Sequence, residues 1–327
     1  MVTTPNMPSP VAVLRACGWL TADAGPARVQ DVSSSHSVHR AMRADGSEAI
    51  VKKCRADGRR GLSNELFVYR LASWSEALGK VLARPLLIDE CTQLLVLEAL
   101  PGAPAQRQRL AEPRFMRRIG ETLATIHRAT LDQPIPPSPA AGVLEVADRP
   151  GDTGHDRPAQ TRALMHRIAR DPLLADALRA AKASYRNRCL IHGDLRPEHW
   201  MDLPDGTLRL IDWEMGGGGD PMLDLAAAMV EPALDGIRRG ALRHDWLFTS
   251  SEALAELVAG YRAAGGPAPL DSIEGRTHAV HLGAARLLHI ACEWADTGML
   301  ASAVEALVDA ARGLLLRTDI ASERIAA

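Results

Sequence analysis

Two short polar blocks, each preceded by apolar residues, constrain this sequence more than any other feature. The first spans residues 191–200 and reads IHGDLRPEHW, and the second spans residues 210–214 and reads LIDWE. Each block has the pattern of a loop that leaves the end of a short strand. Two carboxylates, those of Asp194 and Asp212, are thereby presented on neighbouring loops.

Two carboxylates placed in this way suit phosphoryl transfer, which needs one for the acceptor hydroxyl and one for the metal ion on the phosphates. The blocks resemble the loops of the aminoglycoside phosphotransferase and choline kinase-like enzymes, relatives of the protein kinases. In that family the catalytic loop reads His-x-Asp, four further residues and Asn. Here His192 and Asp194 match, His199 stands at the Asn position, and Asp212 stands at the metal-binding Asp. The segment GDPMLDLA at 219–226 matches the part that usually follows.

The resemblance covers residues from about 30 to about 310 and implies a two-lobed, protein kinase-like α/β (α+β) fold. The small mixed N-lobe, residues 1–100, would hold an antiparallel sheet and bind the nucleotide. The mostly helical C-lobe, residues 101–327, would carry the catalytic and metal loops (191–220) and a helical acceptor-binding region. A chain of 327 residues is long enough for two lobes, and Pro101-Gly102 marks a break between them.

Composition excludes several other classes of protein. The formal net charge of −2 does not suggest a nucleic-acid partner. The five cysteines are scattered without metal or redox spacing, which is typical of reduced thiols in a cytoplasmic protein. No apolar run reaches about 18 residues and no secretion signal opens the chain, so we expect neither a membrane span nor secretion.

The first part of the chain is strand-like from Val29 onward. Residues 38–54 read as a hairpin because Asp45-Gly46 is a strong turn signal. The resemblance places the nucleotide-phosphate loop at residues 33–37, with Ser34 and Ser35 as contacts. That loop contains no glycine, and an ordinary polar turn is an equally good interpretation.

Lysine is rare in this sequence, and two of its four lysines are adjacent, Lys52 and Lys53. Alternation along a strand puts them on opposite faces, so only one can reach the cleft. The resemblance favours Lys52 as the residue that pairs with the phosphates and Glu65 as the carboxylate that orients it; solvated lysines and a helix-dipole role for Glu65 are the alternatives. Ser63 or Asn64 is expected to cap the helix that carries Glu65.

The segment LEALPG at 97–102 resembles the hinge whose backbone meets the adenine ring, which implicates Glu98 and Leu100 in nucleotide binding. Residues 81–87 and 94–100 read as two further strands, and Pro85 inside the first restricts it to a sheet edge. Residues 131–160, rich in proline, read as an acceptor-side lid or as variable surface. Periodic apolar residues predict helices over 114–130, 254–263, 277–295 and 300–316, and a helical run over 161–188 that is interrupted at Asp171-Pro172. The glycine run at 216–219 reads as a flexible connection.

The resemblance also assigns roles at the two loops. Asp194 would orient the acceptor hydroxyl and take its proton, and Asp212 would coordinate Mg²⁺. Arg196 would neutralise charge on the transferring group, or else form a loop-surface salt bridge. At His199, nitrogen replaces the oxygen that Mg²⁺ prefers, which leaves one-metal catalysis, a shifted metal preference or lost transfer as outcomes. Asp224 would cap nearby backbone.

The sequence therefore predicts an ATP-dependent phosphotransferase that moves the γ-phosphoryl group to a hydroxyl of a small molecule, such as an aminoglycoside or another metabolite alcohol. Mg²⁺ is the expected metal, and GTP is an alternative nucleotide. Two other functions stay open. One is a kinase for Ser or Thr of a ribosomal precursor peptide, with elimination by a partner protein; the other is a degenerate nucleotide-binding scaffold.

Overall fold

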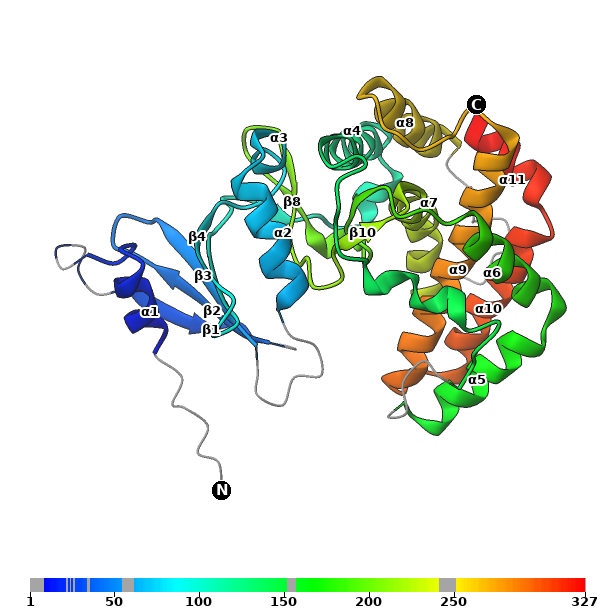
Figure 1. The fold of residues 1–327 in the computed structure, drawn as a ribbon, viewed down its shortest axis with the longest axis horizontal. Helices are drawn as coiled ribbons and strands as arrows, with labels where there is room; N and C mark the ends of the chain where they lie inside the picture. The colour runs from blue at the N-terminus through cyan, green and yellow to red at the C-terminus, as the bar shows by residue number, and fades with distance from the viewer. Residues whose placement is uncertain are drawn as a thin grey trace. The chain divides into compact units, whose positions relative to one another are not determined.

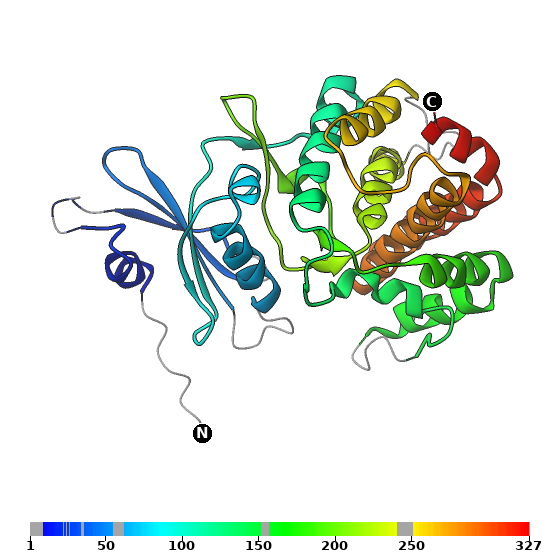
Figure 2. The same cartoon turned by 45° about the horizontal axis from the view of Figure 1, so that its top comes forward.

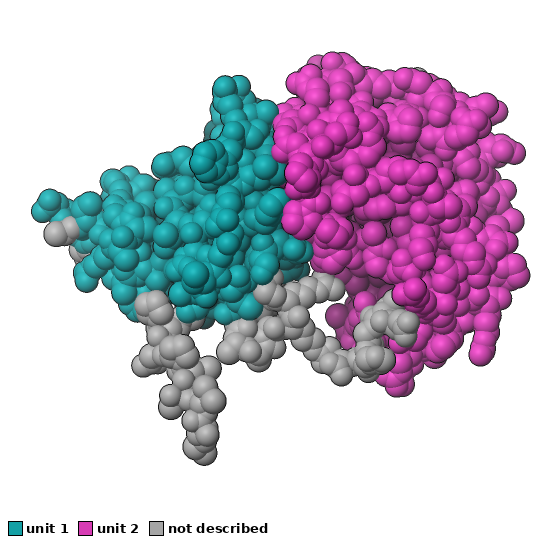
Figure 3. All heavy atoms as spheres, in the orientation of Figure 1, with its two compact units in different colours: residues 1–104, 200–214 teal, residues 105–199, 215–327 magenta. Residues whose placement is uncertain are grey.

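The computed structural model of this chain describes residues 9–326, except for residues 22, 24, 26, 34–35, 55–61, 152–156 and 241–250. The chain forms two compact units, coloured separately in Figure 3. Unit 1 comprises residues 1–104 and 200–214, and unit 2 comprises residues 105–199 and 215–327. An antiparallel sheet dominates unit 1 and helices dominate unit 2, which confirms the predicted α/β fold with a kinase-like division of structure.

Unit 1 is built on a five-stranded antiparallel sheet with the strand order β1-β2-β3-β5-β4. The strands are β1 (Arg28–Asp31), β2 (Ser37–Met42), β3 (Glu48–Lys53), β4 (Pro85–Asp89) and β5 (Leu94–Glu98). The predicted hairpin is present as β2 and β3, with Gly46 in the left-handed region at φ +83°. Pro85 opens β4 at the sheet edge, where a missing N–H removes no ladder bond.

Two helices pack on this sheet, α1 (Pro10–Ala16) and α2 (Ser63–Ser73), on opposite faces in Figures 1 and 2, and a short helix α3 (Glu76–Gly79) follows them. Val13 and Leu14 of α1 are buried in one hydrophobic cluster with Val51 and Val96 of the sheet. The predicted cap of α2 was wrong: its N-cap is Leu62 and no side chain caps it.

A small three-stranded sheet joins residues 200–214 to unit 1. Its order is β6-β8-β9, formed by β6 (Ala103–Pro104), β8 (Trp200–Asp202) and β9 (Leu208–Leu210). The N–H of Leu210 also donates to the carbonyl oxygen of Val81 at 2.9 Å. The loop that follows β9 is therefore anchored in unit 1.

Unit 2 is a bundle around the long helix α9, which packs against α5, α6, α7, α10 and α11 (Figures 1 and 2). Its helices are α4 (Pro113–Ala129), α5 (Ala159–Arg170), α6 (Pro172–Ser184), α7 (Pro221–Arg238), α8 (Ser251–Ala263), α9 (Ile273–Asp296), α10 (Ala301–Leu315) and α11 (Thr318–Ala326). Short 3-10 turns are η2 (Arg107–Ala111), η3 (Pro139–Glu145) and η4 (Pro197–His199). The predicted helices are confirmed, whereas α11 was not predicted. Among the described residues, no helix is long and apolar enough to cross a membrane.

The glycine run is not a flexible connection, and that prediction was wrong. It forms the buried strand β10 (Gly217–Gly219), which pairs antiparallel with β7 (Cys189–Ile191). A Cβ atom added to Gly218 would lie 2.4 Å from Oδ1 of Asn187 and 2.6 Å from the carbonyl oxygen of Ile135. Glycine is needed here because the neighbouring chain segments approach too closely for any side chain.

The first half of the proline-rich segment 131–160 is a packed part of unit 2. The N–H of Ser138 donates to the carbonyl oxygen of Gly218 in β10 at 2.8 Å. Its hydroxyl caps η3. Val143 and Leu144 of η3 are buried. Residues 152–156 lie outside the described part of the chain.

Candidate active site

A buried lysine in unit 1 is paired with two carboxylates. Lys52 lies on β3, and its Nζ atom is 2.6 Å from Oε2 of Glu65 on α2 and 2.7 Å from Oδ1 of Asp212 on the loop after β9. The adjacent Lys53 lies beside Val13 of α1, on the other face of the sheet. The structure therefore brings three of the predicted residues together, and the register of β3 selects Lys52 over Lys53.

The charges in this cluster favour the ionised lysine. Burial acts to lower the pKa of Lys52, but Glu65 and Asp212 together outweigh burial and hold that pKa above its ordinary value. Burial raises the pKa of Glu65, and Lys52 acts against that rise. The side chain of Glu65 is 2% exposed and that of Asp212 is 38% exposed. Among the described residues, Lys52 thus faces two carboxylates, and that of Asp212 is the more exposed of the two.

The backbone of Asp212 lies in the left-handed region, with φ of +65°. Residues other than glycine rarely adopt this conformation, although Asp and Asn tolerate it best. Strain of this kind costs on the order of 1–3 kcal/mol and is concentrated at functional sites. The next residue, Trp213, is fully buried and donates its indole N–H to the carbonyl oxygen of Leu210 at 3.2 Å. This anchor gives the Asp212 carboxylate a defined direction.

A histidine from the predicted phosphate loop meets the same metal-loop segment. His36 is buried, and its Nε2 lies 3.3 Å from Oε2 of Glu214. Burial and the charge of Lys52 lower the pKa of His36, which favours the neutral ring. The side-chain amide of Asn64 donates to the carbonyl oxygen of Glu214 at 3.1 Å. Ser34 and Ser35, which were predicted to contact the nucleotide, lie outside the described residues.

The predicted hinge residues lie at the end of β5. The N–H of Glu98 donates to the carbonyl oxygen of Arg84 at 2.9 Å, and its exposed carboxylate pairs with Nε of the same arginine at 2.9 Å. Leu100 follows two residues later and is half-buried. Contact of this segment with an adenine ring stays a prediction.

In unit 2, Asp194 lies on the loop after β7. Asp224 holds this loop by binding its backbone N–H groups. The Asp224 carboxylate on α7 accepts the N–H groups of His192 at 2.7 Å and Gly193 at 2.9 Å. It also lies 3.3 Å from Nε2 of the buried His127. Gly193 takes a φ of +78°, and a Cβ atom there would clash with neighbouring segments at 2.8 Å. The expected capping role of Asp224 is confirmed by these contacts.

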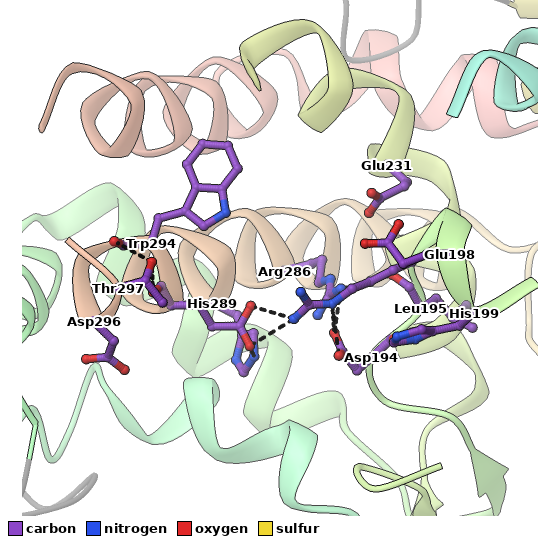
Figure 4. A network of polar contacts seen from close by, with 12 residues as sticks. Asp194, Leu195, Glu198, His199, Glu231, Arg286, His289, Trp294, Asp296 and Thr297 are labelled. Carbon is purple, nitrogen blue, oxygen red and sulfur yellow. Dashed lines mark hydrogen bonds and ion pairs between the residues drawn. The ribbon is translucent and has the colours of Figure 1, made fainter. Parts of the chain in front are cut away.

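Two arginines, Arg196 and Arg286, bind the carboxylate of Asp194; Figure 4 labels Arg286 and Asp194. Nε of Arg196 lies 3.0 Å from Oδ1 and 2.9 Å from Oδ2, and Nη2 of Arg286 on α9 lies 2.9 Å from Oδ1. Burial acts to raise the pKa of Asp194, but Arg286 and Arg196 outweigh it and hold that pKa well below its usual range. Asp194 is therefore ionised at neutral pH and is a weak base.

Arg196 has a second partner in Glu293, also on α9. Its Nη2 atom lies 3.1 and 2.9 Å from the two carboxylate oxygens of Glu293. The ring of His289, one helical turn earlier, lies 3.4 Å from the same carboxylate. Burial acts to raise the pKa of Glu293, but His289 and Arg196 lower it overall. Arg196 therefore bridges two carboxylates, and its expected role toward a transferring group stays a prediction.

His199, which stands at the family's Asn position, is fixed by the catalytic loop itself. Its Nδ1 lies 2.9 Å from the carbonyl oxygen of Asp194. Since a carbonyl only accepts, Nδ1 carries the hydrogen of this bond. Within the described ranges, no group of three or more His, Cys, Asp or Glu is placed to hold a metal ion. Mg²⁺ typically takes only one or two carboxylates together with substrate phosphates.

A third arginine holds the far end of the catalytic loop. Both Nη atoms of Arg107 in η2 are used: Nη2 lies 2.9 Å from each carboxylate oxygen of Glu198, and Nη1 lies 3.2 Å from Oε1 of Glu231 on α7. Glu231 is buried, and burial raises its pKa to about 8 although Arg286 and Arg107 oppose the rise. The loop is thus held from α7, α9 and η2.

Sequence reasoning missed the contribution of α9. Arg286 and Glu293 are seven residues apart, which is close to two helical turns, so they share a face of the helix. The one local signal was a charged residue inside the otherwise apolar stretch around residue 286. Nothing in that pattern connects it with a loop about 90 residues earlier.

The kinase-like fold and the two carboxylate loops define a phosphotransferase of the kinase type. Comparison with protein families agrees: the profile described as "Phosphotransferase enzyme family" (APH) matches residues 29–275, and the chain belongs to this family. It is therefore an enzyme that transfers a phosphoryl group to a hydroxyl group. A search of curated proteins found no match.

Three solved structures with the same fold share 13–18% of their sequence with this chain. An ethanolamine kinase from Plasmodium vivax shares 13% identity, with 94% of this chain and 86% of that chain covered and a TM-score of 0.63. The choline kinase LicA from Streptococcus pneumoniae shares 18% identity, with 92% and 97% covered and a TM-score of 0.58, and LicA has also been solved in complex with AMP. An aminoglycoside phosphotransferase from Alicyclobacillus acidocaldarius shares 16% identity, with 98% and 97% covered and a TM-score of 0.58.

Proposed function

We propose that this enzyme transfers the γ-phosphoryl group of ATP, bound with Mg²⁺, to a hydroxyl group of a small molecule. The observation that carries the proposal is the cluster in which Lys52 lies between Glu65 and Asp212. A lysine oriented by a helix carboxylate and set beside a carboxylate on a separate loop is the arrangement that holds nucleotide phosphates in kinases. The adenine nucleotide is supported by the AMP complex of LicA.

The residues of the cluster fit a magnesium nucleotide. Asp212 offers hard carboxylate oxygens, which Mg²⁺ prefers, and its side chain is 38% exposed. The metal ion would neutralise charge on the phosphate oxygens when bound. Lys52 would exchange its bond with Asp212 for the phosphates while Glu65 keeps it in place. His199, which stands at the family's Asn position, would offer a nitrogen ligand to a metal ion.

On the acceptor side, Asp194 would orient the hydroxyl by accepting its hydrogen bond. Its low pKa makes it a weak base, and this is sufficient because the transition state is loose and positioning matters more than basicity. Arg196 is the nearest exchangeable cation and would counter charge on the transferring group. A small-molecule acceptor is supported by the ethanolamine kinase, choline kinase and aminoglycoside phosphotransferase among the similar structures.

A cytoplasmic location is part of the same proposal. All five cysteines lie in the described part of the chain, and none forms a disulfide. Reduced thiols are typical of proteins in a reducing compartment. ATP is also supplied there.

The first experiment is nucleotide binding by calorimetry, with ATP and GTP and with Mg²⁺ and Mn²⁺ varied. We expect metal-dependent ATP binding that weakens at least tenfold in Asp212→Ala. A matched control is Asp205→Ala, a change of a carboxylate in the exposed turn between β8 and β9, which should leave binding unchanged. Absence of binding to either nucleotide with any metal would contradict the proposal and favour the scaffold alternative.

The second experiment measures ATP consumption with a panel of acceptors. The panel contains amino alcohols, aminoglycosides, sugars and a Ser/Thr-containing peptide, each tested with the native enzyme and with Asp194→Asn. We expect transfer to at least one small alcohol and its loss in the variant. Transfer to the peptide alone would replace the small-molecule acceptor with the precursor-peptide alternative.

A further inference from the structure

The two oxygens of the Asp194 carboxylate are unequally occupied. Oδ1 accepts from Nη2 of Arg286 at 2.9 Å and from Nε of Arg196 at 3.0 Å, whereas Oδ2 accepts only from Nε of Arg196, at 2.9 Å, among the described residues. A carboxylate oxygen offers about two lone-pair positions. Oδ1 is therefore filled, and Oδ2 retains capacity for one more donor.

The two arginines also differ in how firmly they are held. The Arg286 side chain is 4% exposed, and its Nη2 atom also donates to the carbonyl oxygen of Leu195 at 3.0 Å. It therefore ties the carboxylate to the backbone of the same loop. The Arg196 side chain is 27% exposed and ends on a partly exposed Glu293. Moving a buried, paired charge is costly, whereas a partly exposed arginine exchanges partners at a smaller cost.

The helix that carries Arg286 is suited to a fixed role. α9 is buried along most of its length and packs against α7 and α10. The nearby Glu231 does not replace Asp194 as the partner of Arg286, because burial raises the pKa of Glu231 to about 8 and so favours its neutral form at pH 7. Figure 4 shows Arg286 directed from this helix toward Asp194, with Glu231 on its other side.

We propose that Arg286 is the positioning residue that fixes Oδ1 of Asp194, so that Oδ2 receives the acceptor hydroxyl when Arg196 turns away. This inference rests on the proposed function, because it acts through the carboxylate to which that function assigns the hydroxyl. When Nε of Arg196 leaves, the two hydrogen bonds of Arg286 still hold the carboxylate and the Leu195 carbonyl. The orientation of Oδ2 is thereby kept through the reaction.

The first test is Arg286→Gln in the full-length enzyme with an acceptor found in the panel. We expect kcat to fall by roughly 10²-fold, the loss that a displacement of about 1 Å at a reacting group brings. The KM values for ATP and acceptor should change by no more than about threefold. The matched control is Arg312→Gln. Arg312 on α10 pairs with Asp171, the N-cap of α6, so this variant also breaks an arginine–carboxylate pair of unit 2, and it should leave kcat unchanged.

The second test is a double-mutant cycle with Asp194→Asn, measured in single turnover at excess enzyme. If Arg286 acts through Asp194, adding Arg286→Gln to Asp194→Asn should lower the rate by less than about twofold. A structural role would instead multiply the two losses. Calorimetric ATP binding in each variant gives the folded fraction, to which every rate is normalised.

Arg286→Lys keeps the charge and serves if the glutamine variant does not fold. Its kcat should be at least about tenfold higher than that of Arg286→Gln and still lower than the native value. The reason is that an ammonium group replaces the guanidinium that spans the Asp194 carboxylate and the Leu195 carbonyl. A native kcat in Arg286→Gln, or multiplicative losses in the double-mutant cycle, would overturn this inference. The proposed function would still stand if Asp194→Asn lost transfer. Native activity in Asp194→Asn would overturn both.

Discussion

The two loops present their carboxylates by opposite means. In unit 1, Asp212 itself takes the left-handed conformation, is 38% exposed and shares one lysine with Glu65. In unit 2, the left-handed position falls on Gly193, one residue before Asp194, and the carboxylate is buried between two arginines. In the first loop the positive φ falls on the predicted metal-binding residue itself, and in the second it falls on a glycine, which adopts it without steric cost.

This difference matches the chemistry proposed for each carboxylate. A metal ligand benefits from an exposed carboxylate in a cluster with surplus negative charge, because a cation then completes the site. A residue that orients a hydroxyl benefits from a fixed, charge-balanced carboxylate, because its direction matters more than its basicity. Four variants test whether the contrast holds, beginning with the largest expected effect.

Asp194→Asn should lower kcat by about 10³-fold, within the range for loss of a group that handles the proton. The amide keeps the shape but places a donor where the hydroxyl has to donate. Steady-state kinetics on the acceptor measures this, and ATP binding should stay within twofold of the native value. If ATP binding weakened as much as kcat fell, the contrast between the two carboxylates would fail, because Asp194 would then serve the nucleotide as well.

Lys52→Arg should lower kcat/KM for ATP by about 10²-fold, since a planar fork does not replace a compact ammonium between Glu65 and Asp212. Lys53→Arg is the matched control, because that residue lies on the opposite face of the sheet and should leave the rate unchanged. Equal losses in the two variants would show that the buried pair has no particular role in ATP use.

Gly193→Ala should lower the free energy of unfolding by about 2–3 kcal/mol, because the added Cβ would clash and the residue has a positive φ. Gly313→Ala, in α10 with open space around it, is the control and should be neutral or stabilising by up to about 1 kcal/mol. Chemical denaturation of both variants measures the difference. A stable Gly193→Ala protein would mean that this loop is not rigid.

Glu231→Gln should change how stability depends on pH. The folded chain keeps the Glu231 proton up to a pKa of about 8, whereas the unfolded chain releases it near the ordinary value, so the free energy of unfolding falls as pH rises through that window. The slope is up to about 1 kcal/mol per pH unit, and the variant should lose this contribution. Unfolding at pH 6, 7 and 8 tests it, with the half-exposed Glu305→Gln as control; an unchanged slope would make Glu231 a charged partner of Arg107.

Local patterns were enough to predict much of the fold and part of the site. Asp45-Gly46 indicated the β2–β3 hairpin, apolar periodicity indicated the helices of unit 2, and strand alternation with the family resemblance selected Lys52. These features depend on residues close together in the sequence. The residues at the predicted metal and catalytic loops are in place, and their roles stay predictions.

The misses all depend on distant neighbours. Glycine has no strand propensity, so the need for Gly218 appears only when Asn187 and Ile135 are seen against it. The pairing of Arg286 with Asp194 joins residues 92 positions apart. The cap expected at Asn64 was wrong because its amide instead binds the carbonyl oxygen of Glu214.

Unit 1 is discontinuous, and this has a consequence for how the protein is made. Residues 1–104 leave the ribosome first, but residues 200–214, which provide Asp212 and the strands beside β6, follow only after about 95 more residues. At 5–20 residues per second this interval lasts about 5–20 s. During this interval Lys52 has Glu65 available but not Asp212, so its pair of carboxylates is incomplete while the first helices of unit 2 emerge.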